Sequence, residues 1–128
     1  MMDKLIAEAK MAREKAYAPY SNFKVGAAVL TIDGKIFIGS NVENSSYGLS
    51  ICAERAAIFN AVSSGYKKFT KIAVVTDSEP PSSPCGACRQ VIFEFGDDIE
   101  VIMANLKGDV KIEKIDKLLK DGFKIPKK

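Results

Sequence analysis

The residues best suited to chemistry in this sequence are its three cysteines and a nearby glutamate. Cys52 lies two residues before Glu54, while Cys85 and Cys88 lie three residues apart. We expect all three cysteines at helix starts, where positive partial charge lowers the thiol pKa and favours the metal-binding thiolate. Three thiolates suit a soft metal, zinc first, and leave one of its four tetrahedral positions open. An open position is typical of catalytic rather than structural zinc sites.

Composition narrows the possible chemistry. The 128-residue chain has no histidine, which excludes imidazole bases, Ser-His-Asp triads and H-E-x-x-H zinc helices, so acid and base work falls to carboxylates or metal-bound water. The 3 cysteines cannot all pair within one chain, and Met1–Lys10 lacks the apolar stretch of a signal peptide, so reduced cysteines in a cytoplasmic protein are expected. No apolar run approaches the roughly 18 residues of a membrane span.

Length and charge set further expectations. Apolar residues make up 47% of the chain and charged residues 27%, which predicts one globular domain over residues 1–128. Lysine and arginine number 19 against 16 acidic residues, a net charge of +3. This balance lacks the concentrated basic face of a nucleic-acid binder. We therefore expect neither nucleic acid nor membrane as a partner.

Hydrophobic periodicity and turn residues predict the elements that position the cysteines. In the first half of the chain the expected elements are a helix over Met2–Ala16, strands over Val25–Thr31 and Lys35–Gly39, a polar loop over Asn41–Ile51, and a helix over Cys52–Ser64 with Ser50 as a possible N-cap. In the second half they are a strand over Ile72–Thr76, a helix that begins at Pro84 and is capped by Ser83, and a strand within Ile99–Ala104. A helix through Ile112–Leu119 and a solvated basic tail over Lys124–Lys128 complete the chain. The strand, helix and strand between residues 72 and 104 form a crossover, so those two strands are expected to be parallel. The result is an α/β fold with a mixed sheet and helices on both faces.

Taken together, the cysteine segments match the three-cysteine form of a zinc-deaminase signature, because Cys52-Ala53-Glu54 is followed by Pro84-Cys85-Gly86-Ala87-Cys88. The chain resembles the cytidine deaminase family in its small homotetrameric branch, from the first helix to about Phe123. The resemblance rests on Pro19–Phe23, Val25–Ala28, Asn41–Asn44, Tyr47, Cys52–Arg55 and Pro84–Val91. It implies a three-layer α/β/α sandwich around a mixed sheet of about five strands.

The resemblance also implies an activity. Members of the family convert cytidine and 2′-deoxycytidine to uridine and 2′-deoxyuridine with release of ammonia, a step of pyrimidine salvage. Cys52, Cys85 and Cys88 would hold one zinc ion per chain, and Glu54 would carry protons between water and substrate. Arg55 matches the family's cation that hydrogen-bonds the thiolates, and Gln90 is a further candidate for that role.

Substrate-binding residues follow from the same resemblance. Asn41 and Glu43 match the residues that hold the ribose hydroxyls, Phe23 packs beside the ring, and the Ala53 backbone meets the polar edge of the base. A carboxylate at position 43 that accepts a hydrogen bond from the 3′-hydroxyl favours free nucleosides over polynucleotides. The residues that match Tyr47 and Phe123 lie at subunit contacts, so the resemblance implies a homotetramer with active sites near those contacts.

Other interpretations use the same residues. A lone C-x-x-C segment is also typical of a redox dithiol, and Cys52 could be an ordinary buried core residue. Glu54 could interact with the helix dipole, or it could be the fourth ligand of a non-catalytic zinc module. Asn41 and Glu43 could also be residues that cap the polar loop. Arg55 could be a surface arginine, and Phe123 could be a core residue that caps the last helix. A deaminase of a cytosine-containing antibiotic, such as blasticidin S, shares the metal motif. Two positions depart from the family pattern, namely Ala56 in place of threonine and Lys120 in place of proline.

Overall fold

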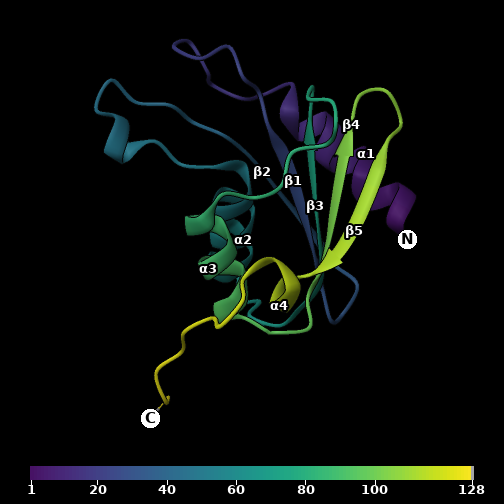
Figure 1. Ribbon diagram of the computed structural model, residues 1–128, viewed down its shortest axis with the longest axis vertical. Coiled ribbons are helices and arrows are strands. Elements are labelled where there is room, and N and C mark those ends of the chain that lie inside the picture. The colour runs from purple at the N-terminus through teal and green to yellow at the C-terminus, as the bar shows by residue number, and fades with distance from the viewer. Residues whose placement is uncertain (128) are drawn as a thin grey trace.

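A computed structural model describes residues 1–127 and contains one five-stranded sheet flanked by helices (Figure 1). Its elements are α1 (Met2–Arg13), β1 (Gly26–Thr31), β2 (Ile36–Ser40), the 3-10 helix η1 (Tyr47–Leu49), α2 (Ala53–Ser63), β3 (Phe69–Thr76), α3 (Gly86–Glu94), β4 (Glu100–Asn105), β5 (Val110–Lys114) and α4 (Ile115–Leu118). None of the described helices combines the length and apolar character needed to cross a membrane.

The sheet has the strand order β2-β1-β3-β4-β5. Strands β3 and β4 pair in parallel, with Ile72 opposite Val101, and every other neighbouring pair is antiparallel. The predicted hairpin of β1 and β2 is confirmed, and Gly34 takes a φ of +87° in its turn, a conformation that glycine adopts without steric cost. The predicted parallel crossover and mixed sheet are therefore confirmed.

Side chains that alternate along the strands build two cores, one on each face of the sheet. On one face Ala28 and Leu30 of β1 pack with Leu5 of α1, and on the other Val29 packs with Ile58 of α2. Figure 1 shows α1 on one side of the sheet and α2 and α3 on the opposite side. The expected three-layer α/β/α sandwich is confirmed.

Two glycines allow the helices to approach the sheet closely. A Cβ atom on Gly26 would lie 1.9 Å from the carbonyl oxygen of Ala9, and one on Gly39 would lie 2.3 Å from the backbone nitrogen of Ala57. Since Gly39 is in β2 and Ala57 in α2, this close approach fixes the height of α2 above the sheet. The position of its N-terminus, where Cys52 lies, depends on that contact.

The helix predicted through Ile112–Leu119 is confirmed only over Ile115–Leu118, which form the short helix α4. Its first part is wrong, because Ile112 lies in β5 opposite Ile102. The Asn105 side chain accepts hydrogen bonds from the backbone of Lys107 and Asp109, at 3.0 Å each. These bonds close a turn that returns the chain along β4, so long-range strand pairing overrides the helical spacing.

Several predicted boundaries also need correction. Helix α1 ends at Arg13 rather than Ala16, and β3 begins at Phe69, whose side chain is buried while that of its neighbour Thr70 is exposed. Ser50 is not an N-cap, because Cys52 occupies that position in α2. In the basic tail, residues 124–127 are exposed. Lys128 lies outside the described residues.

Candidate active site

Two helix starts bring the three cysteines together. Cys52 is the N-cap of α2, Cys85 is the N-cap of α3, and Cys88 lies in the first turn of α3. Helix α3 begins at Gly86 rather than at the predicted Pro84, because the backbone of Cys85 is extended, with a ψ of 168°. The sequence-based expectation that all three thiols lie at helix starts is nevertheless confirmed.

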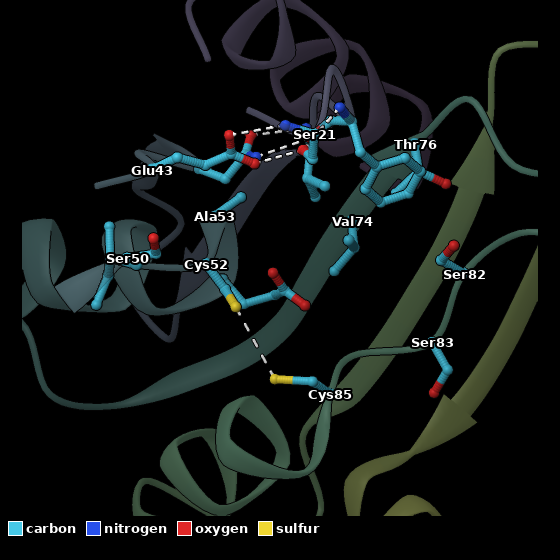
Figure 2. Close-up of a pocket in the computed structure, with 15 residues that line it drawn as sticks. Ser21, Glu43, Ser50, Cys52, Ala53, Val74, Thr76, Ser82, Ser83 and Cys85 are labelled. Carbon is cyan, nitrogen blue, oxygen red and sulfur yellow. Dashed lines mark hydrogen bonds between the residues drawn. The ribbon is translucent and has the colours of Figure 1, made fainter. Parts of the chain in front are cut away.

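The three sulfur atoms have the spacing of a zinc site. All lie within 4.8 Å of one another, and the Sγ atoms of Cys52 and Cys85 are 3.9 Å apart (Figure 2). Zinc–sulfur bonds of about 2.3 Å in tetrahedral geometry place two sulfur atoms roughly 3.8 Å apart. The donor set therefore fits zinc, and among the described residues Glu54 is not part of this ligand cluster.

Hydrogen bonds distribute charge unevenly over the sulfur atoms. The pKa of Cys52 is lowered, first by a hydrogen bond from the Cys88 thiol and then by the guanidinium of Arg55. The pKa of Cys88 is raised because its proton is held against Cys52 and because it is buried. Arg55 donates from Nη2 to Cys52 Sγ at 3.3 Å. The guanidinium of Arg55 therefore favours the thiolate form of Cys52, the form that binds a metal ion.

Glu54 follows Cys52 in the first turn of α2 and is only 4% exposed. Burial raises the pKa of its carboxyl group to about 7, because a low dielectric disfavours the charged form. A carboxyl group of this pKa both accepts and returns a proton near neutral pH. Glu54 lines the same pocket as Cys52 and Cys85, so it can exchange protons with a molecule bound there.

The pocket has a volume of about 320 Å³ and lies over the carboxyl end of β3. Figure 2 shows Ser21 and Glu43 at one end, Cys52 and Cys85 at the other, and Val74 between them. The lining residues are Ser21, Phe23, Val25, Asn41, Glu43, Ser50, Ile51, Cys52, Ala53, Glu54, Val74, Thr76, Ser82, Ser83 and Cys85. Phe23, Asn41, Glu43 and Ala53, singled out from the sequence as substrate-binding residues, thus meet in one pocket.

At the end of the pocket away from the cysteines, Asn41 and Glu43 hold two loops together. Asn41 accepts from the Val25 nitrogen and donates to the Phe23 oxygen, both at 2.8 Å. The Glu43 carboxylate accepts from the Ser21 hydroxyl, the Ser21 nitrogen and the Tyr20 nitrogen. The Ser21 hydroxyl is the main reason that the pKa of Glu43 is lowered. Both side chains therefore cap loops and line the pocket at once.

Five residues singled out from the sequence do not line this pocket. Cys88 and Arg55 belong to the sulfur cluster beside it, and the other three are Tyr47, Phe123 and Gln90. Tyr47 is 79% exposed and lines an adjoining hollow with Tyr20. Phe123 is 66% exposed, so the idea that it is a core residue is wrong. The predicted contact of Gln90 with the thiolates is corrected, because its side chain is directed at the C-terminal segment and its Nε2 donates to the Phe123 oxygen at 2.7 Å.

Sequence reasoning missed part of the pocket wall. Thr76, Ser82 and Ser83 line it, and Arg89 donates to the Ser83 hydroxyl. The sequence predicts only a helix cap at Ser83. The signal that could have placed Ser83 and Arg89 at the site is their proximity in sequence to Cys85 and Cys88. Thr76 carries no such signal, since its position depends on where β3 ends beneath the pocket.

Comparisons with known proteins agree with this geometry. The family model described as "Cytidine and deoxycytidylate deaminase zinc-binding region" matches residues 1–104. A cytidine deaminase of Sporosarcina psychrophila is 55% identical over 95% of this chain and 90% of its own, and one of Halalkalibacterium halodurans is 51% identical over 93% and 91%. The crystal structure of cytidine deaminase from Burkholderia pseudomallei is 56% identical and superposes with a TM-score of 0.93 over 96% of this chain and 99% of its own. This chain therefore belongs to the cytidine deaminase family.

Proposed function

We propose that this protein is a zinc-dependent enzyme that hydrolyses cytidine and 2′-deoxycytidine to uridine and 2′-deoxyuridine, releasing ammonia. The observation that carries the proposal is the buried Glu54 carboxyl group, with a pKa of about 7, in the same pocket as Cys52 and Cys85. Relatives more than 50% identical over most of the chain are named cytidine deaminases. Their names and the pocket chemistry support the same reaction.

Cys52, Cys85 and Cys88 would hold one zinc ion per chain. Zinc bound there would supply the nucleophile for C4 of the pyrimidine, by lowering the pKa of a water ligand from 15.7 to about 7. Glu54 would take one proton from the attacking water and give it to N3 of the base, which makes C4 more electrophilic. Glu54 would then take the second proton from the oxygen that has become bonded to C4 and give it to the exocyclic N4. The C4–N4 bond breaks, ammonia leaves, and the oxygen remains as the C4 carbonyl of the uridine product. Transfers of this kind contribute about 10²–10⁴-fold to the rate.

The polar end of the pocket would bind the sugar. The Asn41 amide would exchange hydrogen bonds with the ribose hydroxyls and the Glu43 carboxylate would accept one from them. The Phe23 side chain would pack beside the ring of the substrate, and the Ala53 backbone would meet the polar edge of the base. If the 3′-hydroxyl belonged to a polynucleotide, the Glu43 carboxylate would lose the hydrogen bond from that hydroxyl and would face the negative charge of a phosphate. A free nucleoside is therefore the proposed substrate class, as suits pyrimidine salvage in the cytoplasm.

We also propose that residues 1–128 form one catalytic domain and that four chains assemble with active sites near their contacts. Exposed aromatic rings beside the pocket support a contact surface there, among them Tyr20, Phe23 and Tyr47, at 52%, 43% and 79% exposure. Phe123 is a candidate to reach a neighbouring chain. Sedimentation equilibrium tests this: the expected mass is about four times the 13.9 kDa chain, and a monomer at micromolar concentration contradicts it.

Ammonia release from free cytidine by the zinc-loaded protein tests the proposed function, with loss of cytidine absorbance followed in parallel. Turnover of cytidine and 2′-deoxycytidine is expected, with no deamination of a single-stranded oligonucleotide. A folded protein with one zinc per chain that releases no ammonia from either nucleoside would contradict the nucleoside assignment. Blasticidin S is then the substrate to test, because an antibiotic deaminase shares the metal motif.

A further inference from the structure

The segment between β3 and α3 forms one wall of the pocket without any helix or strand of its own. Ser82, Ser83 and Cys85 all belong to this segment and line the pocket, and Figure 2 shows them along one side of it. The first hydrogen bond of α3, from the Arg89 nitrogen to the Cys85 oxygen at 2.9 Å, anchors the last residue of the segment. No strand ladder or helical hydrogen bond holds the described residues before it, so the path of the chain into Cys85 depends on side-chain contacts.

Arg89 of α3 supplies two of these contacts and a third hydrogen bond that ties it to α4. Its Nε donates to the Pro84 oxygen at 2.8 Å and its Nη2 to the Ser83 hydroxyl at 2.6 Å. Its Nη1 donates to the Leu118 oxygen at the end of α4, at 2.6 Å. A guanidinium presents its donors in a rigid plane, so three simultaneous acceptors fix the two segments relative to each other. An ammonium group on a lysine stem cannot reproduce this arrangement.

The other end of the segment has separate anchors. The Ser78 hydroxyl lies 2.8 Å from the Thr76 hydroxyl and 2.6 Å from that of Ser82. Asn105 of β4 donates to the Ser78 oxygen at 3.0 Å. Because these contacts do not involve Arg89, its loss is expected to release only the short stretch from Ser83 to Cys85, which carries a sulfur atom of the cluster.

We propose that Arg89 is a positioning residue that holds the Ser83–Cys85 stretch so that the Cys85 sulfur stays in place for metal binding. This inference rests on the proposed zinc-dependent function. Arg89 acts through Pro84 and Ser83 and touches neither the reacting atoms nor the sulfur atoms. Its role differs from that of Arg55, which contacts Cys52 directly.

Cobalt-loaded protein tests the proposal independently of turnover. Absorption from sulfur-to-cobalt charge transfer reports the coordination of the metal, and competition with a chelator gives the zinc dissociation constant. Arg89→Lys is expected to shift the cobalt spectrum and to raise the zinc dissociation constant about tenfold, within the range typical of groups that orient ligands. Ser83→Ala removes one of the three acceptors, so a smaller change in the same direction is expected. Ser83→Ala also keeps the proposal testable if Arg89→Lys does not fold.

Asn60→Ala is the matched structural control, because Asn60 of α2 donates to the Ile38 oxygen of β2 at 3.2 Å, and neither residue lines the pocket. It is expected to lower stability while leaving the cobalt spectrum unchanged. If Arg89→Lys behaves like this control, with unchanged spectrum and zinc affinity, the positioning role is overturned. If the native protein binds cobalt but does not deaminate cytidine, the proposed function is contradicted and the positioning role of Arg89 is not. If the native protein binds neither cobalt nor zinc, both the proposed function and the positioning role are overturned.

Discussion

The Nη2 atom of Arg55 lies 3.3 Å from the sulfur of Cys52. The two residues lie three positions apart at the start of α2, a spacing that puts side chains on one helix face. Three thiolates around Zn²⁺ carry a net charge of −1, which weakens the metal as a Lewis acid. A hydrogen-bonded cation beside one sulfur offsets that charge.

Replacement of Arg55 tests this contact. Arg55→Gln is expected to lower zinc affinity and kcat/KM by about 10–100-fold, since groups that hydrogen-bond metal ligands typically have effects of this size. Arg55→Lys keeps the charge without the planar fork, so an intermediate loss is expected. Chelator competition and steady-state kinetics measure both effects. Native zinc affinity and native turnover in Arg55→Gln would show that the contact with Cys52 has no role.

Glu54→Gln separates proton transfer from metal binding. The amide has nearly the same shape but cannot accept and return a proton, so activity is expected to fall by at least about 10²–10⁴-fold while one zinc per chain remains bound. Elemental analysis and ammonia release give the two readings on the same sample. Loss of zinc together with unfolding would instead identify Glu54 as a structural ligand, the alternative left open by the sequence.

The hydrogen bond between Ser21 and Glu43 predicts a pH effect. It is the main cause of the lowered pKa of Glu43, so Ser21→Ala is expected to move that pKa up toward 4.5. A lowered folded pKa means that the stabilising contribution is present above the unfolded pKa and is lost as the pH falls through the folded pKa. In Ser21→Ala the folded pKa approaches the unfolded value, so this pH-dependent contribution to stability becomes smaller. Carbon NMR titration of the Glu43 carboxyl group measures the shift, and an unchanged value refutes it.

Gly39→Ala tests the packing of α2 on β2. A Cβ atom at position 39 would lie 2.3 Å from the Ala57 nitrogen, so either the helix or the strand must move, at a cost of about 1–3 kcal/mol or more. Urea unfolding measures the loss. Gly48→Ala is the matched control, because no atom lies within 4 Å of its Cβ position. Equal stabilities of the two variants would argue against close packing at Gly39.

Metal removal is expected to lower the stability of the whole chain. Zinc that binds only the folded state adds about 2.7 kcal/mol at a free concentration 100 times its Kd. Thermal unfolding with and without a chelator measures this difference, and Cys88→Ser, which removes one sulfur ligand, should largely abolish it. Identical unfolding curves for the native protein in both conditions would contradict a metal site built from the three cysteines.

Local features of the sequence were enough to predict much of the site. The spacing of Cys85 and Cys88 places both thiols at one helix start, and Asp33-Gly34 marks the hairpin, because each depends on backbone geometry within a few residues. Pairing between distant strands was not predictable in the same way. Ile112 has the spacing of a helix with Ile115 but lies in β5, because its partner Ile102 belongs to another part of the chain.

The sequence by itself determined the family resemblance and the residues proposed as zinc ligands and as the acid–base group, since residue type and local spacing decide those features. Only the tertiary structure decided how the pocket is completed. Glu54 has a raised pKa because the fold buries it, and Arg89 can hold the Cys85 segment because Leu118, 29 residues away, supplies a carbonyl group. Burial and long-range hydrogen bonds depend on which distant segments meet, and spacing along one segment does not carry that information.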